Sequence, residues 1–218
     1  MDVVVHGENI SSQSANILSV SKILSNKKRG TAEITISDGS SFVINEEIIR
    51  MYQLYEGMEI DSDTIENLKK ENEVLAVKEK ALDIVSRSEQ SGYMLKNKLI
   101  KKGFDKQAIS IILSQFYKNG IIDDRRFAEM WISARVKRKR EGRIKLLAEL
   151  SARGISRDIA DAVLQEALPP EMEQNKLKEA YSDLKRKHGE NYEKIYSALQ
   201  RKGFSPANIM RLVNYTED

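Results

Sequence analysis

From about residue 76 onward, apolar residues recur at helical spacing and are separated by short polar corners. In KKGFDKQAI (101–109), Gly103 fits the left-handed position that ends a helix. Phe104 can make the apolar contact just beyond that end, and Asp105 can cap the next helix. The stretch therefore predicts two helices joined by a corner of three residues.

The same corner returns twice farther along the chain. Gly154 lies in SARGISRDI (151–159) and Gly203 in QRKGFSPANI (200–209), so the corner glycines are 51 and 49 residues apart. A further helix is predicted before each pair, over 81–87, 124–136 and 173–187. The body is thus predicted to form three tandem three-helix repeats, nine helices in a short curved solenoid, because no unit can bury its apolar face alone.

Strand-forming residues gather before residue 60. Segments 17–24, 31–37 and 41–44 are predicted strands of an antiparallel meander. Asn45 is a candidate cap for a covering helix that stops at Gly57. The predicted fold class is mainly α, with tandem three-helix repeats preceded by a small α/β domain. The predicted boundaries are 1–60 for this N-terminal domain, 61–77 for a helical connector, and 78–120, 121–168 and 169–218 for the repeats.

Composition narrows the chemistry. The 218 residues include no cysteine and only two distant histidines, His6 and His188, which excludes disulfides and makes a zinc site unexpected. No metal and no cofactor are predicted. No apolar stretch approaches the roughly 18 residues that span a membrane, and the N-terminal apolar run is too short for a signal peptide. We therefore expect a cytoplasmic protein without a membrane partner.

Charge is distributed unevenly along the chain. Residues 1–75 hold 7 Lys and Arg against 13 Asp and Glu, whereas residues 76–218 hold 29 against 20. An acidic front is thus followed by a basic body. This pattern indicates that the body binds an anionic partner, either a nucleic acid or an acidic protein surface.

The strongest cationic feature is RVKRKREGRIK (135–145), which is opposed only by Glu141. A run of this kind is often a solvated helix end, but so many like charges also favour binding to phosphates or carboxylates. Aromatic interleaving is absent, since nearby Trp131 falls on the core-facing stripe, so base reading is not predicted. The candidate binding residues are Arg135, Lys137, Arg138, Lys139, Arg140, Arg143 and Lys145.

Asp123 and Asp124 form the one paired-carboxylate motif that invites a catalytic interpretation. Adjacent helical residues diverge by about 100° and rarely share a site. The better interpretation is that Asp123 caps a helix after Gly120 while Asp124 complements the helix dipole. Triads, phosphate-binding loops and zinc-protease motifs are absent, so no enzyme is predicted.

At this point the residues show a family resemblance. The stretch from FYKNGIIDDRRFAEMW to LLAEL, followed by RGI, resembles the RecX regulatory proteins of bacterial recombination. The resemblance covers about residues 80–165 well and the third repeat in outline. Two positions depart from the family pattern: Ser91 lacks the acid of its capping box, and Arg143 replaces a common proline. The matching motif residues are Gly120, Ile121, Ile122, Asp123, Asp124, Phe127 and Ala128, then Gly142, Leu146, Glu149 and Leu150.

The resemblance implies a non-enzymatic regulator, expected as a monomer, that lies in the groove of the RecA filament on single-stranded DNA. Such proteins limit ATP hydrolysis, strand exchange and co-protease activity in DNA repair. One alternative is a sequence-independent DNA-binding protein that acts on the phosphate backbone. A metal-dependent nuclease using Asp123 and Asp124 is a third, weaker interpretation.

Overall fold

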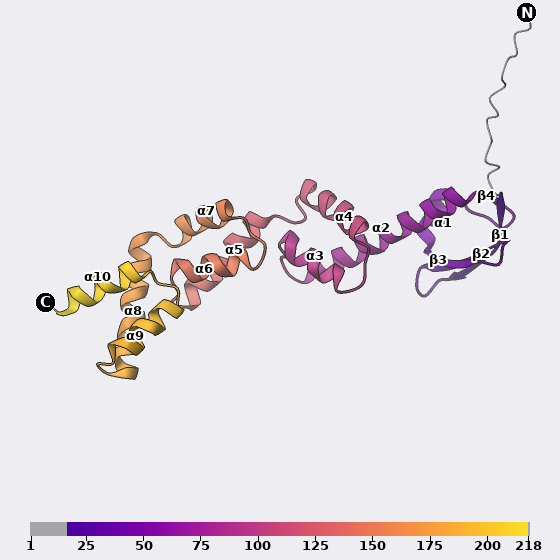
Figure 1. Cartoon of the computed structure of the whole chain (residues 1–218). Helices are drawn as coiled ribbons and strands as arrows, with labels where there is room; N and C mark the ends of the chain where they lie inside the picture. Colours follow the sequence, from indigo (N-terminus) through magenta and orange to yellow (C-terminus); the bar gives the residue numbers. More distant parts are fainter. Residues whose placement is uncertain (1–16, 218) are drawn as a thin grey trace, which may run out of the picture. The chain divides into compact units, whose positions relative to one another are not determined.

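The computed structural model describes the backbone of residues 17–217 and the side chains of residues 17–213. The first sixteen residues of the predicted N-terminal domain, with His6, lie outside this range. The chain divides into two compact units after Glu79. Figure 1 colours the elements in chain order, from the indigo strands to the yellow last helix.

The first unit is built on a four-stranded antiparallel sheet in the order β3-β2-β1-β4. The predicted meander is confirmed, with Ile34 opposite Ile23 on one side and Phe42 on the other. The fourth strand pairs with the start of the first, and its two residues were too few to give a strand pattern in the sequence. The strands are β1 (Leu18–Asn26), β2 (Thr31–Ile36), β3 (Ser41–Asn45) and β4 (Glu59–Ile60).

Helix α1 (Glu46–Tyr52) covers the sheet and begins as predicted, because the Asn45 side chain accepts a hydrogen bond from the Glu47 N–H at 2.8 Å. The predicted stop at Gly57 was wrong. The helix ends at Gln53, which is left-handed with φ 50°, and Leu54 then turns into the core. The core residues of this unit are Val20, Ile34, Ile36, Ile44, Ile48, Leu54, Ile60, Ile65 and Leu68.

Helix α2 (Ser62–Arg87) is continuous over 26 residues. The sequence predicted a helical connector over 61–77 and a first repeat helix over 81–87, and in the structure both segments belong to this one helix. Because neither glycine nor proline occurs between Ser62 and Arg87, nothing in the backbone interrupts the helix. Its first half supplies Ile65 and Leu68 to the core of the first unit.

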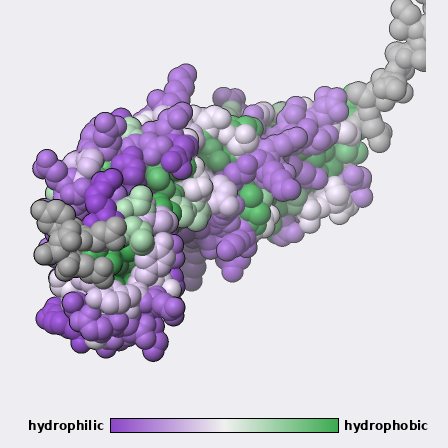
Figure 2. Space-filling model, turned by 60° about the vertical axis from the view of Figure 1, so that its left-hand side comes forward, coloured by the Kyte–Doolittle hydropathy of each residue, from purple (hydrophilic) through white to green (hydrophobic). Residues whose placement is uncertain are grey.

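Helices α2 to α10 confirm the fold class, with a small sheet-containing start followed by three-helix repeats. Repeat 1 comprises the end of α2, α3 and α4; repeat 2 comprises α5 to α7; and repeat 3 comprises α8 to α10. Hydrophilic residues cover most of the face in Figure 2, with apolar residues between them. The bounds are α3 Gly92–Ile100, α4 Lys106–Lys118, α5 Asp124–Arg138, α6 Arg143–Ser151, α7 Arg157–Ala167, α8 Pro170–His188, α9 Tyr192–Arg201 and α10 Pro206–Glu217.

All three corner glycines adopt the predicted left-handed backbone, with φ of 87° at Gly103, 78° at Gly154 and 87° at Gly203. Asp105 caps α4 by accepting hydrogen bonds from two backbone N–H groups at 2.6 and 2.9 Å. Ser156 occupies the matching position before α7, but its side chain makes no capping bond. The left-handed glycine is therefore common to all three corners, whereas the side-chain cap is not.

Gly103→Ala and Gly203→Ala form a matched pair, since both backbones have φ 87°. A Cβ at Gly103 meets nothing within 4 Å, whereas one at Gly203 lies 2.3 Å from the Cβ of Lys145. We expect Gly103→Ala to lower the free energy of unfolding by about 1–2 kcal/mol of backbone strain. Gly203→Ala should lower it by a further amount of about 1–3 kcal/mol from overpacking. Urea denaturation measures both, and equal losses would contradict the close packing at Gly203.

Candidate functional site

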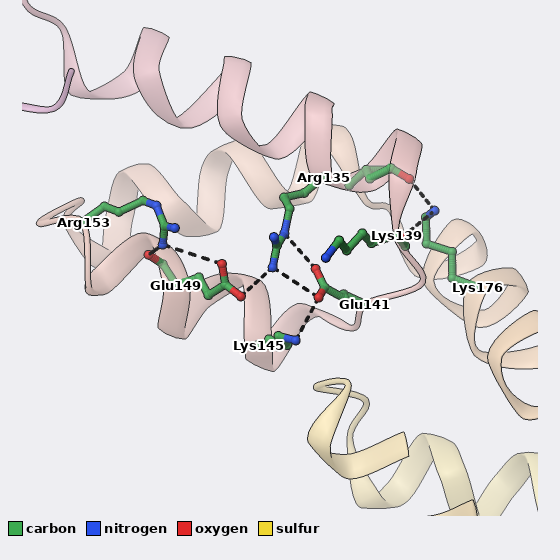
Figure 3. A network of polar contacts seen from close by, with 8 residues as sticks. Arg135, Lys139, Glu141, Lys145, Glu149, Arg153 and Lys176 are labelled. Atoms are coloured by element: carbon green, nitrogen blue, oxygen red, sulfur yellow. Dashed lines mark hydrogen bonds and ion pairs between the residues drawn. The ribbon is translucent and has the colours of Figure 1, made fainter. Parts of the chain in front are cut away.

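The basic run lies where α5 ends and α6 begins. Figure 3 shows several of its side chains directed at carboxylates of the same turn and of the following helix. Four of its seven cations form ion pairs inside the chain, so the run is not a uniform free patch. The paired residues are Arg135, Arg140, Arg143 and Lys145.

Glu141 is the centre of this turn and is only 6% exposed. Its Oε2 lies 2.9 Å from Nε of Arg135, and its Oε1 lies 2.8 Å from Nζ of Lys145. Burial acts to raise the pKa of Glu141, but the hydrogen bond from Lys145 and the charges of Arg135, Lys145 and Lys139 lower it overall. Glu141 is therefore ionised at neutral pH and ties the end of α5 to the start of α6.

Glu149, the acid of the second family motif, extends the network along α6. Its Oε1 lies 2.6 Å from Nη2 of Arg135, and its Oε2 lies 3.6 Å from Nη1 of Arg153. Both guanidinium groups lie over the Trp131 ring, 5.1 and 4.5 Å from its centroid. Trp131 also packs against the core of repeat 2. A ring enclosed in this way offers no platform for base stacking.

Arg140 and Arg143 bind carboxylates beyond the turn. Arg140 pairs with Glu179 at 2.8 Å and with Asp183 at 3.1 Å, both on α8, while Arg143 pairs with Asp161 of α7 at 3.2 Å. These partners were not predicted from the sequence. The available signal was the four-residue spacing of Glu179 and Asp183, which places them on one face of a helix.

Besides Arg140, which is exposed but paired with α8, three cations of the run are exposed: Lys137, Arg138 and Lys139. None of the three makes an ion pair or a side-chain hydrogen bond with the residues that the structure describes. Lys139 lies close enough to Glu141 for its charge to lower the pKa of that carboxyl group. The free positive charge is thus confined to the last turn of α5 and the residue after it.

The start of α6 docks on the corner of repeat 3. The Gly142 N–H donates to the Lys202 carbonyl at 2.9 Å, and the Ile144 N–H donates to the Gly203 carbonyl at 3.1 Å. A Cβ at Gly142 would lie 2.3 Å from that Gly203 oxygen. The family glycine at 142 is therefore required by the close approach of two backbones.

Side chains of helix α8 also bind the backbone where α5 ends and α6 begins. The Lys176 ammonium donates to the Val136 carbonyl at 2.6 Å, near the end of α5. Glu173 accepts a hydrogen bond from the Arg143 N–H at 2.7 Å, which supplies the cap that Gly142 cannot provide. Repeat 3 thus provides hydrogen-bond partners for backbone groups at the end of α5 and at the start of α6.

The first two repeats meet in the same way. The Ser91 hydroxyl donates to the Arg153 carbonyl at 2.6 Å, just before the corner glycine of repeat 2. A Cβ at Gly154 would lie 2.1 Å from the Cβ of Tyr93. Ser91 also caps α3, accepting from the Met94 N–H at 3.1 Å although the acid of the capping box is missing. Each joint therefore seats the start of a second helix on the next repeat's corner.

The two motif aspartates have separate structural tasks. Asp123 caps α5 as predicted, accepting from two backbone N–H groups at 2.8 and 3.0 Å. Asp124 reaches back to repeat 1, where Oδ1 accepts from the Gly92 N–H at 2.9 Å and Oδ2 accepts from the Tyr117 hydroxyl at 3.0 Å. These bonds were not predicted, because Gly92 is 32 residues away in sequence. The carboxylates point to different partners and do not share a site.

The rest of the first motif completes this joint. Arg126 donates to the carbonyls of Gly120 and Ile121, each at 3.1 Å, and pairs with Glu89 at 2.7 Å. Phe127 and its neighbour Ala128 are buried in the core of repeat 2. Within the second motif, Leu150 is buried in the same core.

Within residues 17–217, no helix combines the length and the apolar character needed to cross a membrane. No group of three or more His, Asp or Glu side chains suited to a metal ion occurs among the described residues.

Fold and site together define an α-helical repeat protein whose motif residues join its repeats. The model of the second three-helix domain of RecX matches residues 123–164. The regulatory protein RecX of Treponema pallidum is 33% identical over 131 residues, which cover 60% of this chain and 79% of the relative. That of Clostridium tetani is 29% identical over 196 residues, covering 87% and 88%.

Two solved structures share the fold. A crystal structure of regulatory protein RecX has a TM-score of 0.71 at 20% identity and covers 90% of this chain and 99% of its own. The crystal structure of RecX from Lactobacillus salivarius has a TM-score of 0.59 at 21% identity, with coverage of 66% and 97%. The chain belongs to the RecX family, which confirms the resemblance drawn from the sequence.

We expect Asp124→Asn to lower the free energy of unfolding by about 1–3 kcal/mol, because the charged acceptor of two hydrogen bonds is lost. Burial, followed by the hydrogen bond to Asp124, raises the pKa of Tyr117 from 10.0 to about 12. This phenol therefore contributes stability below pH 10 that is lost as the pH rises towards 12. Ultraviolet titration should show a tyrosine with a pKa of about 12 in the parent protein and a lower pKa for it in the variant. An unchanged titration would contradict the bond.

Glu141→Gln should lower the free energy of unfolding by about 1–3 kcal/mol, because it leaves two cations without their central carboxylate. Since the pKa of Glu141 is lowered from 4.5, its contribution is present above that pH and is lost as the pH falls through the lowered value. Glu179→Gln is the control, because Glu179 is 58% exposed and its loss should cost under about 1 kcal/mol. Denaturant unfolding at neutral and acidic pH tests both, and a larger loss for Glu179→Gln would refute the central role of Glu141.

Proposed function

We propose that this protein binds the RecA filament on single-stranded DNA and restrains its ATPase, strand-exchange and co-protease activities in DNA repair. Its relatives in Treponema pallidum and Clostridium tetani are named regulatory proteins, and the chain shares their family. It acts in the cytoplasm as a monomer and without a cofactor.

The observation that carries this proposal is the exposed cationic segment at the end of α5, formed by Lys137, Arg138 and Lys139. The ion pairs around Glu141 hold the turn that carries it, so little side-chain and loop entropy is lost when a partner binds. Carboxylates of a protein filament and phosphates of its DNA are both suitable partners for such a segment. Repeated units can also make several contacts with a partner that is itself repetitive, which increases avidity.

The test is ATP hydrolysis by RecA from the same source on single-stranded DNA, with this protein titrated in. The parent protein should inhibit at concentrations well below that of RecA. Lys137→Glu/Arg138→Glu should raise the concentration needed by about tenfold, because the two reversed charges repel an anionic surface that the parent attracts. Arg140 is left unchanged, since its pairs with α8 are structural.

Lys178→Glu/Lys187→Glu is the matched control, because both lysines are exposed on α8 and make no ion pair among the described residues. Equal inhibition by all three proteins would show that the segment is only solvated surface. No inhibition by the parent, together with salt-sensitive binding to bare DNA, would favour the alternative of a DNA-binding protein.

A further inference from the structure

The joint between repeats has two halves, and the helical body carries one unused copy of each half. In both joints the residue 12 positions before its own corner glycine, Ser91 or Gly142, donates to the carbonyl just before the next corner glycine. Asn191 has the same position in repeat 3, and none of the described residues provides a corner for it. Repeat 1 has the opposite half, a corner at Gly103 that receives no helix start.

The corner of repeat 1 is open, in contrast to the two that receive a helix. A Cβ added at Gly154 or Gly203 would lie 2.1 or 2.3 Å from a side-chain atom of the preceding repeat, whereas one at Gly103 would meet nothing within 4 Å. The apolar residue after each of the first two glycines is buried, but Phe104 is only half-buried. The Lys102 carbonyl, which corresponds to the acceptors in both joints, accepts no hydrogen bond from the described residues.

The start of α9 is exposed in the same way. Ser91 and Gly142 are buried in their joints, whereas Asn191 is exposed. Its Oδ1 accepts from the Lys194 N–H at 3.1 Å, and its amide nitrogen makes no hydrogen bond with the described residues. Ser91 likewise caps its own helix while it donates across the joint. The Asn191 side chain therefore carries both groups that a joint requires, an acceptor for its own helix and a donor for a corner.

The two open halves carry opposite charges. Glu193 is exposed in the first turn of α9 and makes no ion pair with the described residues. It has the position of Tyr93, whose Cβ lies against the corner glycine of repeat 2. A helix start seated in this way on the corner of repeat 1 would bring the Glu193 carboxylate beside Lys101 and Lys102, which are exposed and unpaired among the described residues. The joints within the chain have uncharged residues at this position, Tyr93 and Ile144.

We propose that this protein associates head to tail, with the start of α9 of one copy seated on the Gly103 corner of a second copy. The contact repeats between copies the joint that the chain uses twice between its own repeats. Because the two surfaces differ, the association is heterologous and extends into rows of copies.

The contact between copies is weaker than the joints within the chain, because it must also offset the loss of translational and rotational freedom. Free copies are therefore monomeric at low concentration, and the contact forms where copies are concentrated or held side by side. It goes beyond the proposed function and needs neither RecA nor DNA, so the two can fail independently.

Cross-linking between two single-cysteine variants tests the contact, because the chain has no cysteine of its own. Lys194→Cys places a thiol at the start of α9, and Lys102→Cys places one at the corner of repeat 1. The two full-length variants, one with an affinity tag that changes its mass, are mixed at high concentration and treated with a short bismaleimide. We expect mixed dimers in clear excess over dimers of either variant with itself. Lys178→Cys, exposed on α8, replaces Lys102→Cys in the control and should give only the background yield.

Gly103→Ala, added to the Lys102→Cys variant, should lower the yield of mixed dimers about tenfold, because its methyl group would occupy the space that the second copy enters. Gly120→Ala is the control for backbone strain, since its φ is 66° and an added Cβ there also meets nothing within 4 Å. It should leave the yield unchanged. Glu193→Lys, added to the Lys194→Cys variant, should also lower the yield, and it changes no left-handed residue. Circular dichroism verifies that each variant is folded.

Each of three results would overturn the proposal. Equal yields with Lys102→Cys and Lys178→Cys would show that the copies meet only by random collision. A predominance of dimers of one variant with itself would show a symmetric contact. An undiminished yield with Glu193→Lys and with a folded Gly103→Ala would show that the contact does not use the joint geometry. Inhibition of RecA by the parent protein is measured separately and is not affected by these results.

Discussion

The close approach of one repeat's second helix to the corner of the next is the constraint on which the helical body depends. At both joints a donor at the helix start reaches the carbonyl just before a left-handed glycine: Ser91 reaches Arg153, and Gly142 reaches Lys202. The glycine is needed twice over, because it reverses the chain and leaves no side chain in the path of the neighbour. One local device therefore ends a helix and positions the following repeat.

Ion pairs also stabilise both joints. At the first joint Arg126 of repeat 2 pairs with Glu89 of repeat 1, and at the second joint Arg140 of repeat 2 pairs with two carboxylates of α8 in repeat 3. The cation therefore lies on the later repeat at the first joint and on the earlier repeat at the second. The exposed pairs contribute little individually. Glu141 differs because it is buried between Arg135 and Lys145, so its removal would leave two partly buried cations without a shared partner.

The residues that join the repeats differ from those that we propose to bind a partner. The family motifs are structural in this chain: Asp124 joins repeat 1 to repeat 2, and Glu149 holds two arginines against Trp131. The cations that the network leaves unpaired, Lys137, Arg138 and Lys139 at the end of α5, are the ones to which we assign partner binding. Because Lys176 and Glu141 hold the end of α5, these cations would offer an anionic partner preorganised charge.

The sequence by itself determined the elements and their order. Helical periodicity, the glycine corners, and caps such as Asn45, Asp105 and Asp123 are local properties, so strands, repeats and helix starts could be predicted from them. Local reasoning failed where the signal was short or absent, as with β4, and where a continuous helix was divided although nothing breaks α2.

Only the tertiary structure decided which charges are free. The seven cations look alike in sequence. Their partners Glu149, Asp161, Glu179 and Asp183 lie 14 to 43 residues away along the chain, and only the fold brings them into contact. In the same way, the acceptor role of Asp124 depends on Gly92 being brought beside it. Ion pairs form between groups a few ångströms apart in space, whatever their separation along the chain. The sequence pattern therefore could not distinguish the paired cations from the unpaired ones.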